Sequence, residues 1–325
     1  MKALLPRLFL ASAFCALTTA SLRADGKDDL SPTIAPPQDN NIPVSQEFEI
    51  DGGYSGNAVE KQGNAHLGNV SNANSHVDYV VSPQLKDGVL LRFGIDAERD
   101  SFGLFPGAPL PNTLQSVNAI VGADLSIGDK IIMRAELHPG IYSDFVDVNG
   151  NSFDCPVQVG GTYLYSKDFQ FILGFQLDLK SDIPFIGIPG FRWQFADKWV
   201  ISAILPKPQL QYELSNSLTL YLGADILNGT YQLNNDFGVT HGHGAAPNNA
   251  QFNNNVVDFT EVRLGAGFTW KFTPNVSLDM SAGYMPYRDF DIHPDKIGYL
   301  MDTTSFHNDL GAGAPYGEAS IKGSF

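Results

Sequence analysis

Apolar and polar residues alternate along most of this chain. The clearest case is FQFILGFQLDL at positions 169–179, where every second residue from Phe169 to Leu179 is apolar and Gln170, Gln176 and Asp178 occupy the other parity. Successive side chains of a β-strand point to opposite faces, so the pattern predicts a strand with one apolar face and one polar face. The stretch is long enough for a tilted strand to cross a bilayer.

The same alternation recurs from residue 44 to the C-terminus and is interrupted by turn sequences. Short turns such as Lys86-Asp87-Gly88 alternate with longer connections rich in Asn and Gly, for which we expect loops at 57–72, 228–255 and 288–313. Outer-membrane barrels have short turns on the periplasmic side and long loops outside. The pattern predicts an all-β fold, an antiparallel transmembrane β-barrel. It has 14 strands if Leu205-Pro206-Lys207-Pro208 turns a hairpin, with 12 strands as the alternative.

The N-terminus predicts export. Lys2 and Arg7 precede an apolar run, Leu8 to Leu17, that is too short to cross a bilayer as a helix, and small residues at Ala20 and Ala24 offer cleavage sites. We expect three parts: a signal peptide at 1–24, a flexible periplasmic segment at 25–43, and an outer-membrane barrel at 44–325. A soluble β-sandwich also alternates, but the export signal favours the barrel.

Charge and cysteine content restrict the partners. Removing Lys2, Arg7 and Arg23 with the signal takes the formal charge from −15 to −18, which argues against nucleic acid. The only cysteine left is Cys155, so no intramolecular disulfide is expected. The expected partners are the lipid bilayer and the outer-membrane assembly machinery. We expect no cofactor and no metal site, and the sequence leaves the oligomeric state open.

Two segments resemble known outer-membrane proteins. The last strand, GEASIKGSF (317–325), resembles the C-terminal signal for barrel insertion, which ends in an aromatic residue, here Phe325. The segment LPKPQLQYELSNSLTLYLGADI (205–226) resembles a family of outer-membrane β-barrel proteins of unknown function, porin-like in general character. The resemblance implies the fold and the location, and no activity.

The parity opposite the apolar one faces the lumen, which predicts a set of charged pore-lining residues. They are Arg92, Asp96, Glu98, Asp124, Arg134, Glu136, Asp178, Arg192, Asp225, Glu261, Arg263 and Asp279. Opposed charged walls set the ion preference of a water-filled pore. Alternatively, the same residues pair across a narrow lumen and fill it. The first interpretation predicts a solute or ion diffusion channel of unknown specificity, and the second a closed structural or adhesive barrel that acts through its loops.

Aromatic residues and one histidine complete the candidates. Trp193, Trp199 and Trp270 lie near turns assigned to one side, as an interfacial girdle requires. An outer-membrane hydrolase is the third class, with His138 near Glu136 as its best candidate base. No serine motif accompanies His138, so we expect no catalytic residues and no enzyme.

Overall fold

The computed structural model describes residues 44–62, 65–237, 252–294 and 306–325, and almost all of them lie in one antiparallel β-sheet. Its strands are β1 (Val44–Gln62), β2 (Ala65–Lys86), β3 (Val89–Gly103), β4 (Thr113–Ile127), β5 (Ile131–Leu137), β6 (Gly140–Ser143), β7 (Phe153–Asp154), β8 (Val157–Leu164), β9 (Phe169–Leu177), β10 (Phe185–Ala196), β11 (Trp199–Ala203), β12 (Gln209–Glu213), β13 (Leu218–Gln232), β14 (Val256–Thr273), β15 (Val276–His293), β16 (Phe306–Ala312) and β17 (Ala314–Ser324). A single turn of 3-10 helix, η1 (Gly150–Ser152), precedes β7.

The sheet closes into a barrel because its first strand pairs with its last. β1 pairs with β2 on one side and with β16 and β17 on the other. Three of the seventeen strands are continuations of a neighbour: β6 continues β5 along β4, β7 leads into β8, and β16 and β17 together lie between β15 and β1. This leaves fourteen crossings, so the 14-strand prediction is confirmed. Pairing between β11 and β12 also confirms a hairpin at 205–208.

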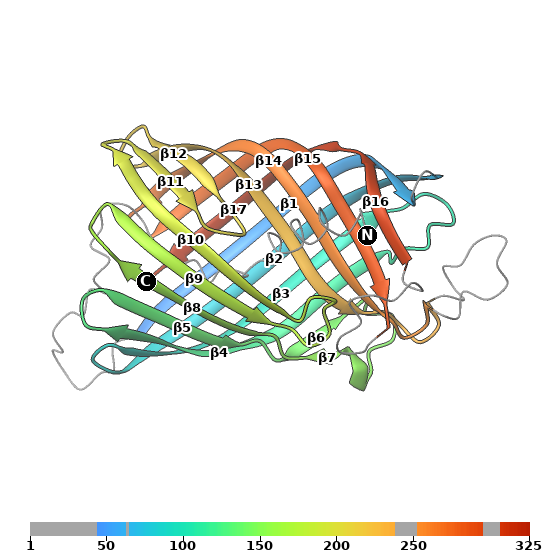
Figure 1. Ribbon diagram of the computed structural model, residues 1–325, viewed down its shortest axis with the longest axis horizontal. Helices are drawn as coiled ribbons and strands as arrows, with labels where there is room; N and C mark the ends of the chain where they lie inside the picture. The colour runs from blue at the N-terminus through green and yellow to red at the C-terminus, as the bar shows by residue number, and fades with distance from the viewer. Residues whose placement is uncertain (1–43, 63–64, 238–251, 295–305) are drawn as a thin grey trace, which may run out of the picture.

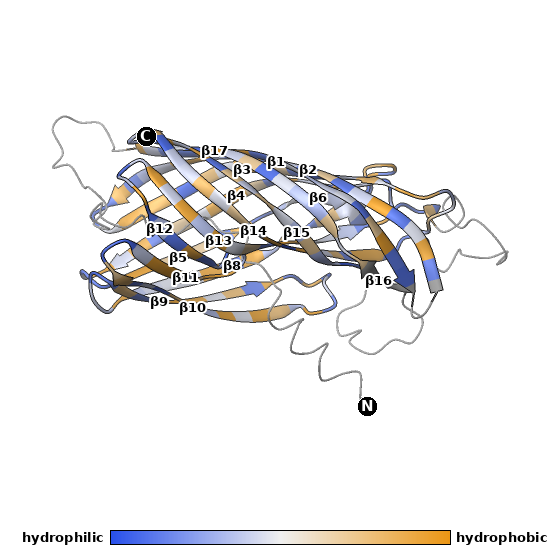
Figure 2. Cartoon of the chain, turned by 90° about the horizontal axis from the view of Figure 1, so that it is seen from above, coloured by the Kyte–Doolittle hydropathy of each residue, from blue (hydrophilic) through white to orange (hydrophobic). Residues whose placement is uncertain are grey.

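The predicted alternation decides which side chains face outward. In β9, Leu173 is 48% exposed on the outer surface, whereas the adjacent Ile172 is 7% exposed and faces the lumen. The same alternation is visible as alternating colours along the strands (Figure 2). An apolar outer face is what lipid requires, and the fold is therefore that of an outer-membrane β-barrel.

The short turns that join β2 to β3, β4 to β5, β10 to β11 and β14 to β15 lie at one end of the barrel with the C-terminus, to the left in Figure 1. We call this the turn end and the opposite one the loop end. In outer-membrane barrels these ends face the periplasm and the exterior, respectively.

Strands at the loop end extend further than the sequence predicted. The expected loop at 57–72 is wrong, because β1 runs to Gln62 and β2 starts at Ala65. β15 likewise runs through Arg288 to His293, within the predicted loop 288–313, and β13 continues to Gln232. Polar composition alone does not indicate a loop here, because inward-facing polar residues of these strands, such as Asn72 and Asn74, are buried and hydrogen-bonded in the lumen.

Several expectations lie outside the described residues. They are the signal peptide at 1–24, the periplasmic segment at 25–43 and residues 238–251 of the predicted 228–255 loop. Within the described part of the chain, no helix is long and apolar enough to span a membrane.

We predict that Leu173→Arg lowers the free energy of unfolding by about 2–4 kcal/mol, because it places a charge in the middle of the lipid-facing band. Leu214→Arg is the matched control, since Leu214 is also 48% exposed but lies beside the turn at 215–217. The control should cost only about 0–1 kcal/mol. Urea titrations of refolded protein measure both values, and equal losses would contradict the assigned bilayer position.

Candidate functional site: a cavity in the barrel lumen

An apolar core fills the loop end of the lumen. Inward-facing side chains from β2, β3, β4, β13, β14 and β15 meet there. The ring of Phe102 lies 5.2 Å from that of Phe259 and 5.0 Å from that of Phe290, between strands on opposite sides of the lumen. Ala108 and Leu110, from the β3–β4 connection, are also buried in it. This core obstructs the axial route into the barrel.

A buried ion network lies beside the apolar core. Glu261 accepts hydrogen bonds from Arg263 at 2.7 Å and from Arg288 at 2.7 Å, and all three side chains are fully buried. Arg263 also donates to Asn74 at 2.8 Å and to Glu318 at 3.0 Å. The network needs a bare backbone at Gly53, where a Cβ atom would lie 2.7 Å from Asn74 Oδ1. Its charges are mutually satisfied, so it serves as packing.

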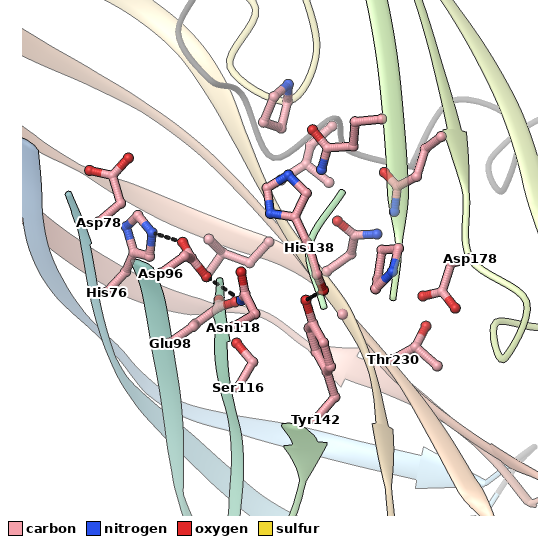
Figure 3. A pocket seen from close by; sticks show the side chains of 18 of the residues that line it. His76, Asp78, Asp96, Glu98, Ser116, Asn118, His138, Tyr142, Asp178 and Thr230 are labelled. Carbon is pink, nitrogen blue, oxygen red and sulfur yellow. Dashed lines mark hydrogen bonds and ion pairs between the residues drawn. The ribbon is translucent and has the colours of Figure 1, made fainter. Parts of the chain in front are cut away.

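Below the core, the lumen contains a cavity of about 190 Å³. One wall is acidic and comes from β1 to β4. On it, His76 bridges Asp51 and Asp96 at 2.7 Å each, and Asn118 donates to Asp96 at 2.7 Å. These strands carry outward-facing apolar residues such as Val77 and Ile95, and the pleat therefore turns the intervening polar residues inward. Figure 3 shows this cluster, with Asp78 and Glu98 beside it.

The opposite wall is less polar. Asp178 and Thr230 lie across the cavity from the acidic wall (Figure 3), and Ile183, Ile186, Pro206 and Ile226 line this side. The cavity thus has a hydrogen-bonding wall and an apolar flank. Sites for small organic molecules commonly combine these two characters.

Negative charge predominates among the cavity-lining residues. Nine carboxylates line it, against Arg92, Lys207, Lys322 and two histidines, His76 and His138. Lys207 lies 3.2 Å from both Asp225 and Glu318, and Lys322 lies 2.7 Å from Glu49, so these cations are already paired. Nine carboxyl groups therefore face five side chains that can carry a positive charge.

The structure brings half of the predicted pore-lining residues into this cavity. Those that line it are Arg92, Asp96, Glu98, Glu136, Asp178 and Asp225. The others lie outside it and are Asp124, Arg134, Arg192, Glu261, Arg263 and Asp279. Asp124 and Arg134 form a two-pronged ion pair at 2.7 Å, and Asp279 accepts from Tyr221 and Thr269. A role for any of them in permeation stays a prediction.

The three tryptophans lie on the outer surface near the turn end. Trp193, Trp199 and Trp270 are 45%, 40% and 46% exposed. Trp199 packs on Tyr212 with ring centroids 4.9 Å apart. Phe325, whose carbonyl accepts from Gln46 N at 2.9 Å, ends the last strand. Their roles as girdle and assembly signal stay predictions.

Sequence reasoning missed His76, Asn118 and Lys207. The outward parity of Val77 and Tyr79 already implied that His76 faces inward, so parity alone was sufficient to find it. Lys207 lies in the hairpin turn, and its side chain extends to Asp225 and Glu318. No sequence pattern predicts that reach.

His138, the candidate base, is not hydrogen-bonded to Glu136. Its Nε2 atom lies 3.6 Å from Glu136 and has no hydrogen-bond partner within the described part of the chain. Nucleophilic catalysis requires a serine or another nucleophile within hydrogen-bond reach of the base.

Residues 105–322, about two thirds of the chain, match the family described as Domain of unknown function (DUF6268). The chain belongs to that family. The resemblance of segment 205–226 to an outer-membrane barrel family of unknown function is thereby confirmed. A search of curated proteins finds no match to this DUF6268 chain.

Solved structures similar to this DUF6268 protein include outer-membrane channels. The Pseudomonas putida toluene transporter TodX is 9% identical, with 86% of this chain and 90% of that chain covered and a TM-score of 0.42. An outer-membrane channel from Pseudomonas putida F1 is 12% identical, with coverages of 88% and 97% and a TM-score of 0.44. A Pseudomonas aeruginosa FadL homologue is 11% identical, with coverages of 87% and 90% and a TM-score of 0.34. At such low similarity, what those channels carry remains a property of those proteins.

We predict that Glu261→Gln lowers the free energy of unfolding by about 3–5 kcal/mol, because it leaves the buried Arg263 and Arg288 without their shared counter-charge. Glu47→Gln is the control, since Glu47 also contacts an arginine, Arg92, at 3.2 Å but is 41% exposed. It should cost at most about 1 kcal/mol. Chemical denaturation of both variants provides the comparison, and a mild Glu261→Gln phenotype would mean that the network is hydrated.

Proposed function

We propose that this protein is an outer-membrane channel that admits small cations or cationic solutes to the lumen cavity. The observation that carries the proposal is the excess of carboxylates around the cavity, nine against five cationic side chains. In a narrow, partly desolvated passage, unpaired carboxylates lower the energy of cations and raise that of anions. The apolar core at the loop end makes this conformation the closed one.

A closed barrel that acts through its loops is the second candidate. The observation in its favour is the same apolar core, because Phe102, Phe259 and Phe290 fill the loop end with rings from several strands. Planar-bilayer recording from refolded protein separates the two candidates. A barrel that never conducts, in any variant below, would support the closed barrel.

We predict a cation-selective wild-type current that the double variant Glu98→Gln, Asp178→Asn makes less selective. Both residues line the cavity, and their neutralisation removes two of its nine carboxylates. The reversal potential across a salt gradient measures this selectivity. Asp129→Asn, at an exposed turn, is the control and should change nothing. Salt screens charge over roughly 10 Å at 0.1 M, so the measurement belongs at low ionic strength. Anion selectivity, or an unaltered reversal potential in the double variant, would contradict the proposal.

A second prediction concerns the apolar core. Phe102→Ala removes one of three rings that meet in the lumen, so single-channel conductance or open probability should increase. The substitution also costs about 3–5 kcal/mol of stability, and folding must be checked by gel mobility before and after heating. Phe153→Ala, at a 53% exposed position of the loop end, is the control. A current equal to that of wild type would show that the core does not obstruct the conducting path.

A further inference from the structure

Among the described residues, the barrel wall has one place where two strands, β10 and β13, have no strand paired between them. β11 and β12 have five residues each and cover only the turn-end part of the gap between β10 and β13. β10 pairs with β11 from Phe191 to Ala196, whereas Phe185–Gly190 pairs only with β9 among the described residues. Beyond the hairpin, no strand of the described residues lies between β10 and β13 (Figure 1). We call this part of the wall the lateral slot.

The edge of β10 that borders the slot contains a proline, Pro189, whose missing N–H is compatible with an edge position. Gln194 N donates to Asp168 O on the β9 side, so the even-numbered residues of β10 point their backbone groups toward β9. The odd-numbered Phe185, Gly187 and Pro189 therefore point theirs into the slot. Proline has no N–H and is confined to edges in β-sheets, so Pro189 leaves no donor unpaired.

The facing edge of β13 and two connections complete the frame. Ala224 N donates to Pro208 O at the end of the hairpin, and the strand pairs of β13 with β12 end at Gly223, whereas those with β14 continue to Gln232. At the loop end, the 178–184 connection closes the slot, because Asp182 N and Ser181 Oγ donate to Asp258 at 2.8 and 3.3 Å. At hairpin level, three strand spacings, roughly 14 Å, separate β10 from β13.

The lumen cavity extends into the slot. On the closed wall only inward-facing residues line the cavity, such as Ser116, Asn118 and Ile120 of β4. On β13, by contrast, six consecutive residues from Ile226 to Tyr231 line it, so both faces of that edge border the cavity. Ile183, Ile186 and Pro206 border it from the other sides. An open edge is tolerated at membrane depth only where it lines a cavity or is covered by protein.

Polar atoms without a hydrogen-bond partner among the described residues belong to side chains that line the same cavity. Asn118 and His138 are 5% and 8% exposed, and both line the cavity. The Oδ1 atom of Asn118 and the Nε2 atom of His138 have no hydrogen-bond partner within the described residues, and neither does Oδ1 of Asp78. Asn118 is oriented by its Nδ2–H bond to Asp96, which fixes Oδ1 as the free acceptor. The Oδ1 atoms of Asn118 and Asp78 can accept hydrogen bonds, and they lie in a cavity with more carboxyl groups than cationic side chains. A positively charged ligand that donates hydrogen bonds would fit this arrangement.

We propose that the lateral slot is a passage between the lipid phase and the cavity, and that its occupant is a small cationic amphiphile, a primary amine on a hydrocarbon chain. The ammonium group lies among Asp78, Asp96 and Asn118, and the chain lies between Ile186 and Ile226. The proposal rests on the proposed function, since both require that the cavity accept cations. It adds the apolar part of the solute and a route that bypasses the apolar core.

The first experiment tests whether lipid reaches the slot. In a Cys155→Ser background, a bimane label is attached at Ile186→Cys or at Ile120→Cys. Both positions line the cavity and are 5% exposed, but Ile120 belongs to the continuous wall of β4. Brominated acyl chains should quench the label at 186 at least about twofold more than the label at 120. Equal quenching at the two sites would overturn the passage.

The second experiment tests the occupant with the same 186 label. Each buried methylene tightens binding about fourfold, so hexylammonium should saturate the emission change at a concentration at least about tenfold below that of methylammonium. Asp78→Asn should weaken hexylammonium binding several-fold and leave hexanol unaffected, while Asp129→Asn should alter neither. Chain-length independence, or hexanol binding as tightly as hexylammonium, would overturn the amphiphile.

Neither fluorescence measurement requires the barrel to conduct, so the slot proposal and the channel proposal can be contradicted independently of each other. A barrel that never conducts but passes both fluorescence tests overturns only the channel. A cation-selective barrel whose label at 186 is not quenched overturns only the slot. Heat-modifiable gel mobility of each labelled variant confirms folding. If the protein labelled at 186 does not fold, the label is placed at Ile183→Cys, which lines the same side of the cavity, and the same quenching ratio is expected.

Discussion

The structure depends on one constraint: a backbone N–H or C=O within hydrocarbon must find a partner, because no water is there to replace it. Pairing of β1 with β17 meets this demand around the whole turn end, where the hairpin of β11 and β12 completes the ring. At the loop end the hairpin stops at 205–208, and two edges remain. The cavity borders those edges, so water or a ligand can satisfy the groups that strands do not.

The second organising feature is the separation of polar from apolar packing along the lumen. At the loop end, aromatic rings and aliphatic side chains fill the interior, as in the core of a soluble protein. Beside them, Arg263, Glu261 and Arg288 satisfy one another, so that burying their charges does not leave any of them without a counter-ion. Only the remaining lumen holds a cavity, and there the carboxylates exceed their partners.

Alternation in the sequence predicted the fold well because a strand between lipid and lumen has only one acceptable orientation. A shift of one residue in FQFILGFQLDL would place Gln170 and Gln176 in lipid. Outside the lipid-facing band this restraint disappears, and polar strand segments such as the start of β2, from Ala65 to Asn72, cannot be distinguished from loops by composition. The ion network at Arg288 was missed for that reason. The cavity was predicted only in part, since parity places Asp96 inward but does not reveal that His76 and Asn118 already bind it.

The structure explains the proline and glycine residues of the segment FIGIPGF (185–191), which the sequence alone did not. Within a fully paired strand, Pro189 would remove a ladder hydrogen bond, and Gly187 and Gly190 would weaken packing. At the edge of the slot, the same residues are compatible with the fold, because the backbone of Pro189 points away from β9 and toward the side where no described strand pairs with it. The short hairpin after it, with Pro206 and Pro208, ends pairing at that level. The proline and glycine residues of β10 and the early turn between β11 and β12 therefore have related effects. Each restricts strand pairing at the same level of the barrel, and together they leave the slot beside the cavity.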